Sequence, residues 1–236
     1  MDWLRAAWAW LAALVLTVVF GSGAILTSWV PPRGRTYLFW ARSWAKAVLF
    51  CAGIPVRVEV TEAARRLPSA ILMANHESAL DILVLFLAVP QEVRFLAKRS
   101  IFYVPFLGWS MWLAGFVPVD RERPDRAKEV FDELSDRLRN GLSVLIFPEG
   151  TRSRDGLLHE FKKSGFLLAL KAGVPIVPVG ICGSRPVLGA RGLVIGDGEV
   201  VVRVGDPVPT EGLGIAGRRA LMEKVRAEIS RLSGRG

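Results

Sequence analysis

After Pro55 the sequence alternates between short runs rich in β-branched residues and longer runs with helical periodicity. Strands are expected at residues 56–60, 70–74, 93–97, 116–119, 143–147, 176–179 and 199–204. Helices are expected at residues 79–88, 103–114, 124–140, 161–172 and 217–232. This order predicts an α/β fold, with a largely parallel mixed sheet of about seven strands flanked by helices.

The first 54 residues follow a different pattern. Residues 6–30 carry no charge, and a helix of that length would reach roughly 37 Å at about 1.5 Å per residue, beyond the approximately 30 Å hydrocarbon thickness of a bilayer. A second apolar stretch, residues 37–54, follows Pro31-Pro32. Tryptophans stand near both ends of the first stretch, as interfacial anchors do: Trp3, Trp8, Trp10 and Trp29.

We therefore expect residues 1–54 to be an N-terminal two-helix membrane motif and residues 55–236 to be the α/β domain. The sequence Gly21-Ser22-Gly23 makes a kink or a break possible in the first helix. Hydropathy leaves open whether the hairpin spans the bilayer or dips into one leaflet, and a cleaved signal peptide is the competing interpretation of the first stretch.

Composition narrows the class of partner. The chain is 51% hydrophobic and carries a net charge of +9, which favours either nucleic acid or an anionic membrane surface. No nucleic-acid-binding signature is present, so the membrane is the preferred partner. Cys51 and Cys182 stand in apolar contexts and are expected to be buried thiols in a reducing compartment. The spacing of possible ligands predicts no metal site, and no cofactor is expected.

The sequence Asn75-His76-Glu77-Ser78-Ala79-Leu80-Asp81 joins an expected strand to an expected helix. Ser78 and Asp81 have the spacing of a capping box, which places Asp81 in the first turn and His76 just outside the helix. There the two side chains could meet as a general base and the group that orients it. The alternative is that the pair only caps the helix.

A second motif, Phe147-Pro148-Glu149-Gly150-Thr151-Arg152-Ser153, follows the expected strand at 143–147. In open α/β sheets, sites gather beyond the carboxyl ends of the strands. Glycine permits a close backbone approach, and the Arg152 guanidinium could bind a phosphate with two hydrogen bonds. An ordinary turn with a surface ion pair is the alternative.

Two weaker blocks complete the pattern. Lys98-Arg99 precedes an aromatic run at 101–109, which would suit either an acyl-chain channel or core packing. Residues 174–180 contain two prolines and are expected to form an edge or bulged strand. His159 stands in a charged loop and is expected to be solvated.

Taken together, the four blocks resemble the glycerolipid acyltransferase family, and within it the bacterial 1-acyl-sn-glycerol-3-phosphate acyltransferases. The family's first motif matches Asn75, His76, Ser78 and Asp81, and its Phe-Pro-Glu-Gly-Thr-Arg-Ser motif matches completely. The remaining matches lie at residues 174–180 and in the second block, at Lys98, Pro105, Gly108, Gly115 and Arg121. The sequence departs from the family at Ser100, where an acidic residue is common, and at Ser164, where glycine is frequent.

The resemblance implies transfer of a fatty acyl group from a thioester to the sn-2 hydroxyl of lysophosphatidic acid, giving phosphatidic acid. His76 would be the general base and Asp81 the residue that orients it. Lys98 and Arg152 would bind the acceptor phosphate, and Glu149 would orient the glycerol or the binding loop that Gly150 and Thr151 belong to.

Several matters stay open at this point. The acyl donor is expected to be acyl-CoA or acyl carrier protein, and no cofactor or nucleic acid is expected. If the protein is an enzyme, the alternative is an acyltransferase that uses a different lysolipid acceptor, such as a lyso-ornithine lipid. If it is not an enzyme, the alternative is a catalytically silent membrane lipid-binding protein. The expected location is the bacterial inner membrane, with the catalytic domain on the cytoplasmic face.

Overall fold

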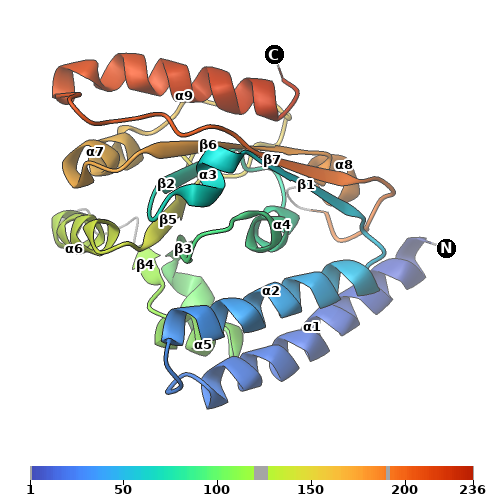
Figure 1. The fold of residues 1–236 in the computed structure, drawn as a ribbon. Helices are drawn as coiled ribbons and strands as arrows, with labels where there is room; N and C mark the ends of the chain where they lie inside the picture. The colour runs from blue at the N-terminus through green and yellow to red at the C-terminus, as the bar shows by residue number, and fades with distance from the viewer. Residues whose placement is uncertain (1, 120–126, 190–191, 236) are drawn as a thin grey trace.

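The computed structural model describes residues 2–119, 127–189 and 192–235, and its described part contains seven strands in one sheet. The sheet has the order β1-β7-β6-β2-β5-β3-β4 (Figure 1). Neighbouring strands are parallel except for β6 and β7, which pair antiparallel. The predicted mixed, largely parallel sheet is therefore confirmed. The strands are β1 Val56–Val60, β2 Ile71–Ala74, β3 Val93–Lys98, β4 Val117–Val119, β5 Ser143–Ile146, β6 Ile176–Cys182 and β7 Val200–Val204.

Helices cover both faces of the sheet (Figure 1). On one face lie α6 (Ala127–Arg139), α7 (Lys163–Ala172) and α9 (Arg218–Leu232), and on the other lies α4 (Leu80–Ala88). The side chains of β2 show why, because all four are fully buried and they alternate between two apolar clusters. A central parallel strand needs both of its faces covered.

The helix expected at residues 103–114 is divided. A 3-10 helix, η1 (Arg99–Tyr103), is followed by α5 (Leu107–Leu113). Pro105 lies between them and forces the preceding residue, Val104, into an extended conformation with ψ of 120°. The other short helices are α3 (Glu62–Arg66), α8 (Ser184–Val187) and η3 (Ile215–Gly217). The expected start of α6 at Pro124 lies outside the described residues.

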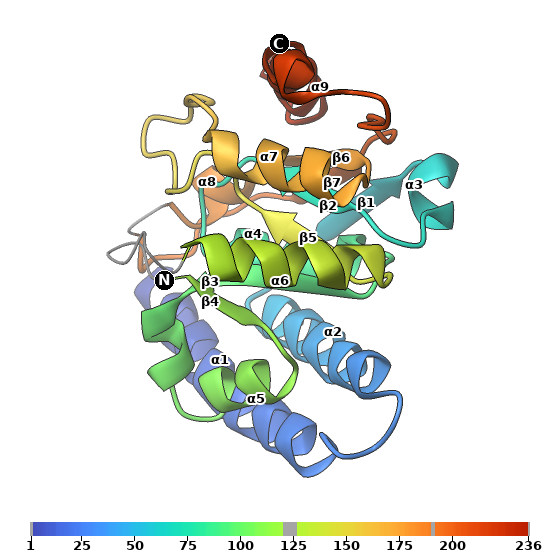
Figure 2. The same cartoon turned by 90° about the vertical axis from the view of Figure 1, so that its left-hand side faces the viewer.

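The N-terminal hairpin consists of α1 (Asp2–Leu26) and α2 (Arg33–Cys51), which lie side by side below α4, while α5 packs beside α1 (Figures 1 and 2). The possible break at Gly21-Ser22-Gly23 does not occur, since α1 is continuous there. The two glycines serve close packing instead. A Cβ atom at Gly21 would lie 2.9 Å from the Cβ of Phe106, and one at Gly23 would lie 2.6 Å from the Trp40 ring.

Large apolar side chains cover the outer surface of α1. Among the described residues, one helix segment, Trp3–Leu26, is long and apolar enough to cross a membrane. Its inner side is lined by small residues, including the buried Ala6, Ala9 and Ala12, while its outer side exposes Trp3, Leu4, Trp8, Leu11 and Leu14. Because α2 shares one apolar core cluster with α4 and the sheet, the hairpin packs on the rest of the molecule. The division at residues 54 and 55 stays a prediction.

Two smaller expectations are corrected. β6 is an interior strand between β7 and β2, so the prediction of an edge strand is wrong. The bulge lies in the neighbouring segment rather than in β6: three residue steps from Ile176 to Val179 face four steps from Val204 to Val208, which leaves one extra residue in that segment opposite Pro178. Cys51 and Cys182 are free thiols as expected, but both are partly exposed rather than buried.

Candidate active site

His76 and Asp81 meet at the carboxyl end of β2. The imidazole Nδ1 lies 2.7 Å from Asp81 Oδ2, and the carboxylate is fully buried while the His76 side chain is 13% exposed. A carboxylate is acceptor-only, so Nδ1 carries the proton in this contact and Nε2 is left as the basic nitrogen. The arrangement is that of a base and the group that fixes its tautomer.

The position of Asp81 is set by the backbone around it. Its Oδ2 also accepts hydrogen bonds from the backbone N–H of Glu77 at 2.7 Å and of Ser78 at 2.8 Å. Asp81 lies in the first turn of α4, where the helix dipole favours a negative charge. The capping box is therefore half confirmed, since the Ser78 hydroxyl accepts from the N–H of Leu80 rather than from that of Asp81.

The imidazole has a second support. Its ring stacks on Phe147 with a centroid separation of 3.8 Å and an interplanar angle of 14°. Phe147 directly follows β5, which pairs with β2, so the ends of the two strands bring the two motifs together. Ring stacking and the Asp81 contact together fix both the tilt and the rotation of the imidazole.

Glu149 joins the two motif loops through its side chain. The carboxylate is buried, and its two oxygens accept from different backbone N–H groups: Oε1 from His76 at 3.1 Å and Oε2 from His159 at 3.0 Å. The N–H of Ser153 donates to the carbonyl of His76 at 2.7 Å. Gly150 adopts a φ of +78°, which favours glycine and allows this loop to turn.

A cavity of about 810 Å³ opens onto His76. Its apolar walls come from α1, α2, α4, β3 and α5, with aromatic side chains prominent among them: Phe20, Trp40, Trp44, Phe86, Phe95 and Phe116. Lys98, Gly150, Thr151 and Arg152, all predicted from the sequence, also line this cavity. The cavity therefore places cationic side chains, the imidazole and a long apolar wall around one space.

Lys162 is a further cavity-lining cation that the sequence motifs missed. Its side chain packs over the binding loop, where a Cβ atom on Gly150 would lie 2.8 Å from Lys162 Nζ. The sequence did contain an indication of an anion site here, because Lys162 and Lys163 stand at the N-terminal end of α7. Cations are disfavoured at that end of a helix, and an anionic ligand nearby would offset the cost.

The remaining predicted residues divide into two groups. Gly108 and Gly115 are structural: a Cβ atom at Gly108 would lie 2.3 Å from the Phe102 carbonyl oxygen, and Gly115 has a φ of +78°. The His159 ring is half exposed and lies 3.1 Å from Asp155, as a solvated loop residue does. Arg121 lies outside the described residues.

Comparison with known proteins identifies the family of this chain. A model of the Acyltransferase family matches residues 55–182, which contain all four motif blocks. The chain is 33% identical over 201 residues to the chloroplastic 1-acyl-sn-glycerol-3-phosphate acyltransferase LPAT1 of Arabidopsis thaliana, covering 83% of this chain and 54% of that protein. It is 36% identical over 174 residues to the human 1-acyl-sn-glycerol-3-phosphate acyltransferase alpha, covering 72% and 62%.

A solved structure is similar over the whole fold. The crystal structure of the 1-acyl-sn-glycerophosphate (LPA) acyltransferase PlsC from Thermotoga maritima superimposes with a TM-score of 0.84 at 26% identity, covering 100% of this chain and 97% of that one. The chain spans about half the length of the plant relatives that it matches. The motifs, their geometry and these matches lead to one conclusion: the chain belongs to the Acyltransferase family.

Proposed function

We propose that this protein transfers a fatty acyl group from a thioester donor to the sn-2 hydroxyl of 1-acyl-sn-glycerol-3-phosphate, giving phosphatidic acid. The observation that carries the proposal is the shared cavity, in which His76 lies between apolar walls and the cations Lys98, Arg152 and Lys162. These three features match the three parts of a lysolipid phosphate: the apolar walls suit its acyl chain, His76 suits its free hydroxyl, and the cations suit its phosphate.

The chemistry follows from the imidazole. Neutral Nε2 takes the proton of the sn-2 hydroxyl while the alcohol oxygen attacks the thioester carbonyl carbon. The tetrahedral intermediate collapses with cleavage of the C–S bond, and the imidazolium returns its proton to the departing thiolate. The oxygen ester and a free thiol are the products, no acyl-enzyme forms, and no cofactor is needed. General-base assistance of this kind accelerates a reaction by roughly 10²–10⁴-fold.

Asp81 would act through His76. It accepts the Nδ1 proton, which keeps Nε2 basic, and its charge stabilises the imidazolium that forms during attack. Its burial strengthens that stabilisation, because water does not screen a charge with no exposed surface.

The acceptor phosphate would lie at the cationic end of the cavity, near Lys98, Arg152 and Lys162, with Gly150 and Thr151 beside it. Glu149 would hold this binding loop rather than contact glycerol, since both of its oxygens already accept backbone hydrogen bonds. The acyl chains would enter between the hairpin and α5, where the cavity wall is aromatic and aliphatic.

The hairpin would associate with the membrane from which the lysolipid comes. The exposed apolar surface of α1 and the net charge of +9 both favour an anionic bilayer. The proposed location is the bacterial inner membrane, with the active site on the cytoplasmic face, where acyl-CoA and acyl carrier protein are available.

A substrate matrix tests the proposal. The purified protein is given acyl-CoA or acyl carrier protein as the donor and lysophosphatidic acid, lysophosphatidylcholine or a lyso-ornithine lipid as the acceptor, with products identified by mass. We expect phosphatidic acid to form faster than any other product. Preferred acylation of a lysolipid without a phosphate monoester would overturn the acceptor assignment, and the absence of any ester would overturn the reaction.

A further inference from the structure

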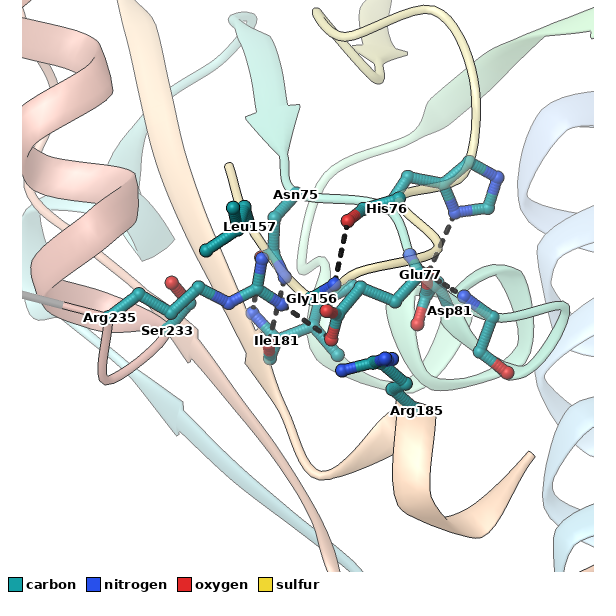
Figure 3. Close-up of polar contacts among 12 residues, drawn as sticks. Asn75, His76, Glu77, Asp81, Gly156, Leu157, Ile181, Arg185, Ser233 and Arg235 are labelled. Carbon is teal, nitrogen blue, oxygen red and sulfur yellow. Dashed lines mark hydrogen bonds and ion pairs between the residues drawn. The ribbon is translucent and has the colours of Figure 1, made fainter. Parts of the chain in front are cut away.

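Glu77 is a buried carboxylate inside the catalytic motif for which the proposed mechanism has no use. It stands between His76 and Ser78, and its side chain is 5% exposed. Figure 3 shows the Glu77 carboxylate and the His76 imidazole on opposite sides of the loop, so Glu77 does not face the reacting atoms. A buried charge of this kind needs a partner.

The partner is Arg235, from the segment that follows α9. Arg235 Nη2 lies 2.5 Å from Glu77 Oε2, and the Arg235 side chain is 17% exposed (Figure 3). Arg185 of α8 lies nearby and Asp81 lies on the other side of the loop. Burial raises the pKa of Glu77 and Asp81 adds to the effect, whereas the positive charges of Arg235 and Arg185 oppose it.

Arg235 is held firmly in place. Its backbone N–H donates to the carbonyl of Ser230 at 2.9 Å, and the Ser230 hydroxyl donates to the Arg235 carbonyl at 2.7 Å. The preceding Gly234 has a φ of +71°, which reverses the chain at the end of α9. Arg235 therefore belongs to a closed turn rather than to a loose tail.

The end of α9 is in turn seated directly on the sheet. A Cβ atom at Gly180 of β6 would lie 2.3 Å from the Leu232 carbonyl carbon, so the two backbones are in contact. The next residue, Ile181, exchanges two hydrogen bonds with the Asn75 amide, at 2.8 and 2.9 Å. The loop that holds His76 is thus fixed to this part of the molecule at two points, Asn75–Ile181 and Glu77–Arg235.

The position of Glu77 also affects Asp81. The N–H of Glu77 is one of the two backbone donors to Asp81 Oδ2, the oxygen that also contacts the imidazole. If loss of the ion pair lets the backbone of this loop shift at Glu77, its N–H moves away and Asp81 loses a donor. A misplacement of about 1 Å at a catalytic group can lower a rate by about 100-fold.

We propose that Arg235 is a positioning residue, which pairs with Glu77 and so holds the loop in which Asp81 orients His76. The inference rests on the proposed function only for its kinetic readout. It assigns a role in catalysis to the turn after α9, which lies on the opposite side of the loop from the substrate cavity.

The kinetic test uses Arg235→Gln in the full chain. Arg231→Gln is the matched control, because Arg231 lies in the last turn of α9 but is exposed and pairs with Glu228 of the same helix. We expect Arg235→Gln to lower kcat by about 10-fold to 100-fold with little change in either KM. Arg235→Lys should recover part of the loss, and Arg231→Gln should match the wild type. An unchanged kcat in Arg235→Gln would overturn the proposal.

A double variant separates pairing from general destabilisation. Glu77→Gln removes the charge that Arg235→Gln leaves unpaired, so Glu77→Gln/Arg235→Gln should be more active than Arg235→Gln alone. Fully multiplicative losses would show that the two residues act independently, and would contradict the pairing.

A spectroscopic readout does not depend on the substrate. The chain has two histidines, His76 and His159, so the imidazole signals of ¹³C,¹⁵N-histidine-labelled protein in detergent are few enough to assign. Arg235→Gln should shift the His76 signals and leave those of His159 in place. If lysophosphatidic acid is not a substrate, this measurement still decides the inference, and an unmoved His76 signal would reject it.

Discussion

The loop around His76 and the mouth of the cavity are built in opposite ways. Asp81, Glu77 and Glu149 are buried, and each contacts a named partner in a neighbouring element. At the mouth, Lys98, Thr151, Arg152 and Lys162 are exposed. The difference indicates that the catalytic loop, with the carboxylates that orient or hold it, is preorganised, whereas the groups proposed for binding can adjust to the lipid headgroup.

This contrast has a kinetic meaning. Removing a preorganised group should reduce stabilisation of the transition state and lower kcat, while removing an exposed cation should weaken ground-state binding and raise KM. The following substitutions test whether the two regions differ in this way.

The largest effect is expected for Asp81→Asn. The amide has the shape of the carboxylate and can keep its oxygen toward the three donors around Oδ2, but it carries no charge to stabilise the imidazolium. We expect kcat to fall by between about 10² and 10⁴-fold. Steady-state kinetics measure this, and thermal unfolding confirms that the variant is folded. A change below threefold would remove Asp81 from the mechanism.

A moderate effect is expected for Lys162→Ala. A hydrogen bond between a cation and a phosphate is worth roughly 1.5–3 kcal/mol, so KM for lysophosphatidic acid should rise by about tenfold or more. The KM for the thioester should stay nearly constant. Lys163→Ala is the control, because Lys163 is exposed at the same helix end but is not a cavity-lining residue. Equal effects of the two variants would contradict a specific phosphate contact.

The smallest effect is expected for Trp29→Ala in the turn between α1 and α2. The Trp29 side chain is 72% exposed, as a residue that inserts into a membrane interface would be. Co-sedimentation with anionic vesicles should weaken by a few-fold. Ile215→Ala is the comparison, since Ile215 is equally exposed but precedes α9 on the other side of the molecule. A larger loss for Ile215→Ala would place the membrane-facing surface elsewhere.

The sequence predicted best where function depends on neighbours along the chain. His76 and Asp81 are five residues apart at a strand-to-helix junction, and local geometry alone brings them together. The seven strands were found for a similar reason, because a strand buried on both faces is a continuous apolar run. Boundaries moved where a proline intervened, as at Pro105, which delays the start of the helix expected at residues 103–114 to Leu107.

The sequence could not show contacts between distant segments. Glu77 with Arg235 and Asn75 with Ile181 join residues more than 100 positions apart, and nothing in the local pattern marks such pairs. Gly21 and Gly23 were interpreted as a possible break because their packing partners, Phe106 and Trp40, are supplied by distant segments of the chain. The prolines of β6 were interpreted as the mark of an edge or bulged strand, because a bulge in the neighbouring segment cannot be foreseen from β6 itself.

Pre-steady-state acyl transfer by His76→Ala is the most direct measurement of the central claim. The variant is mixed with an acyl thioester and lysophosphatidic acid at saturating concentrations, and ester formation is followed beside the wild type. We expect the rate constant for ester formation to fall by at least about 100-fold while donor binding is retained, because the alcohol then loses its general base. Ester formation at the wild-type rate would contradict the account.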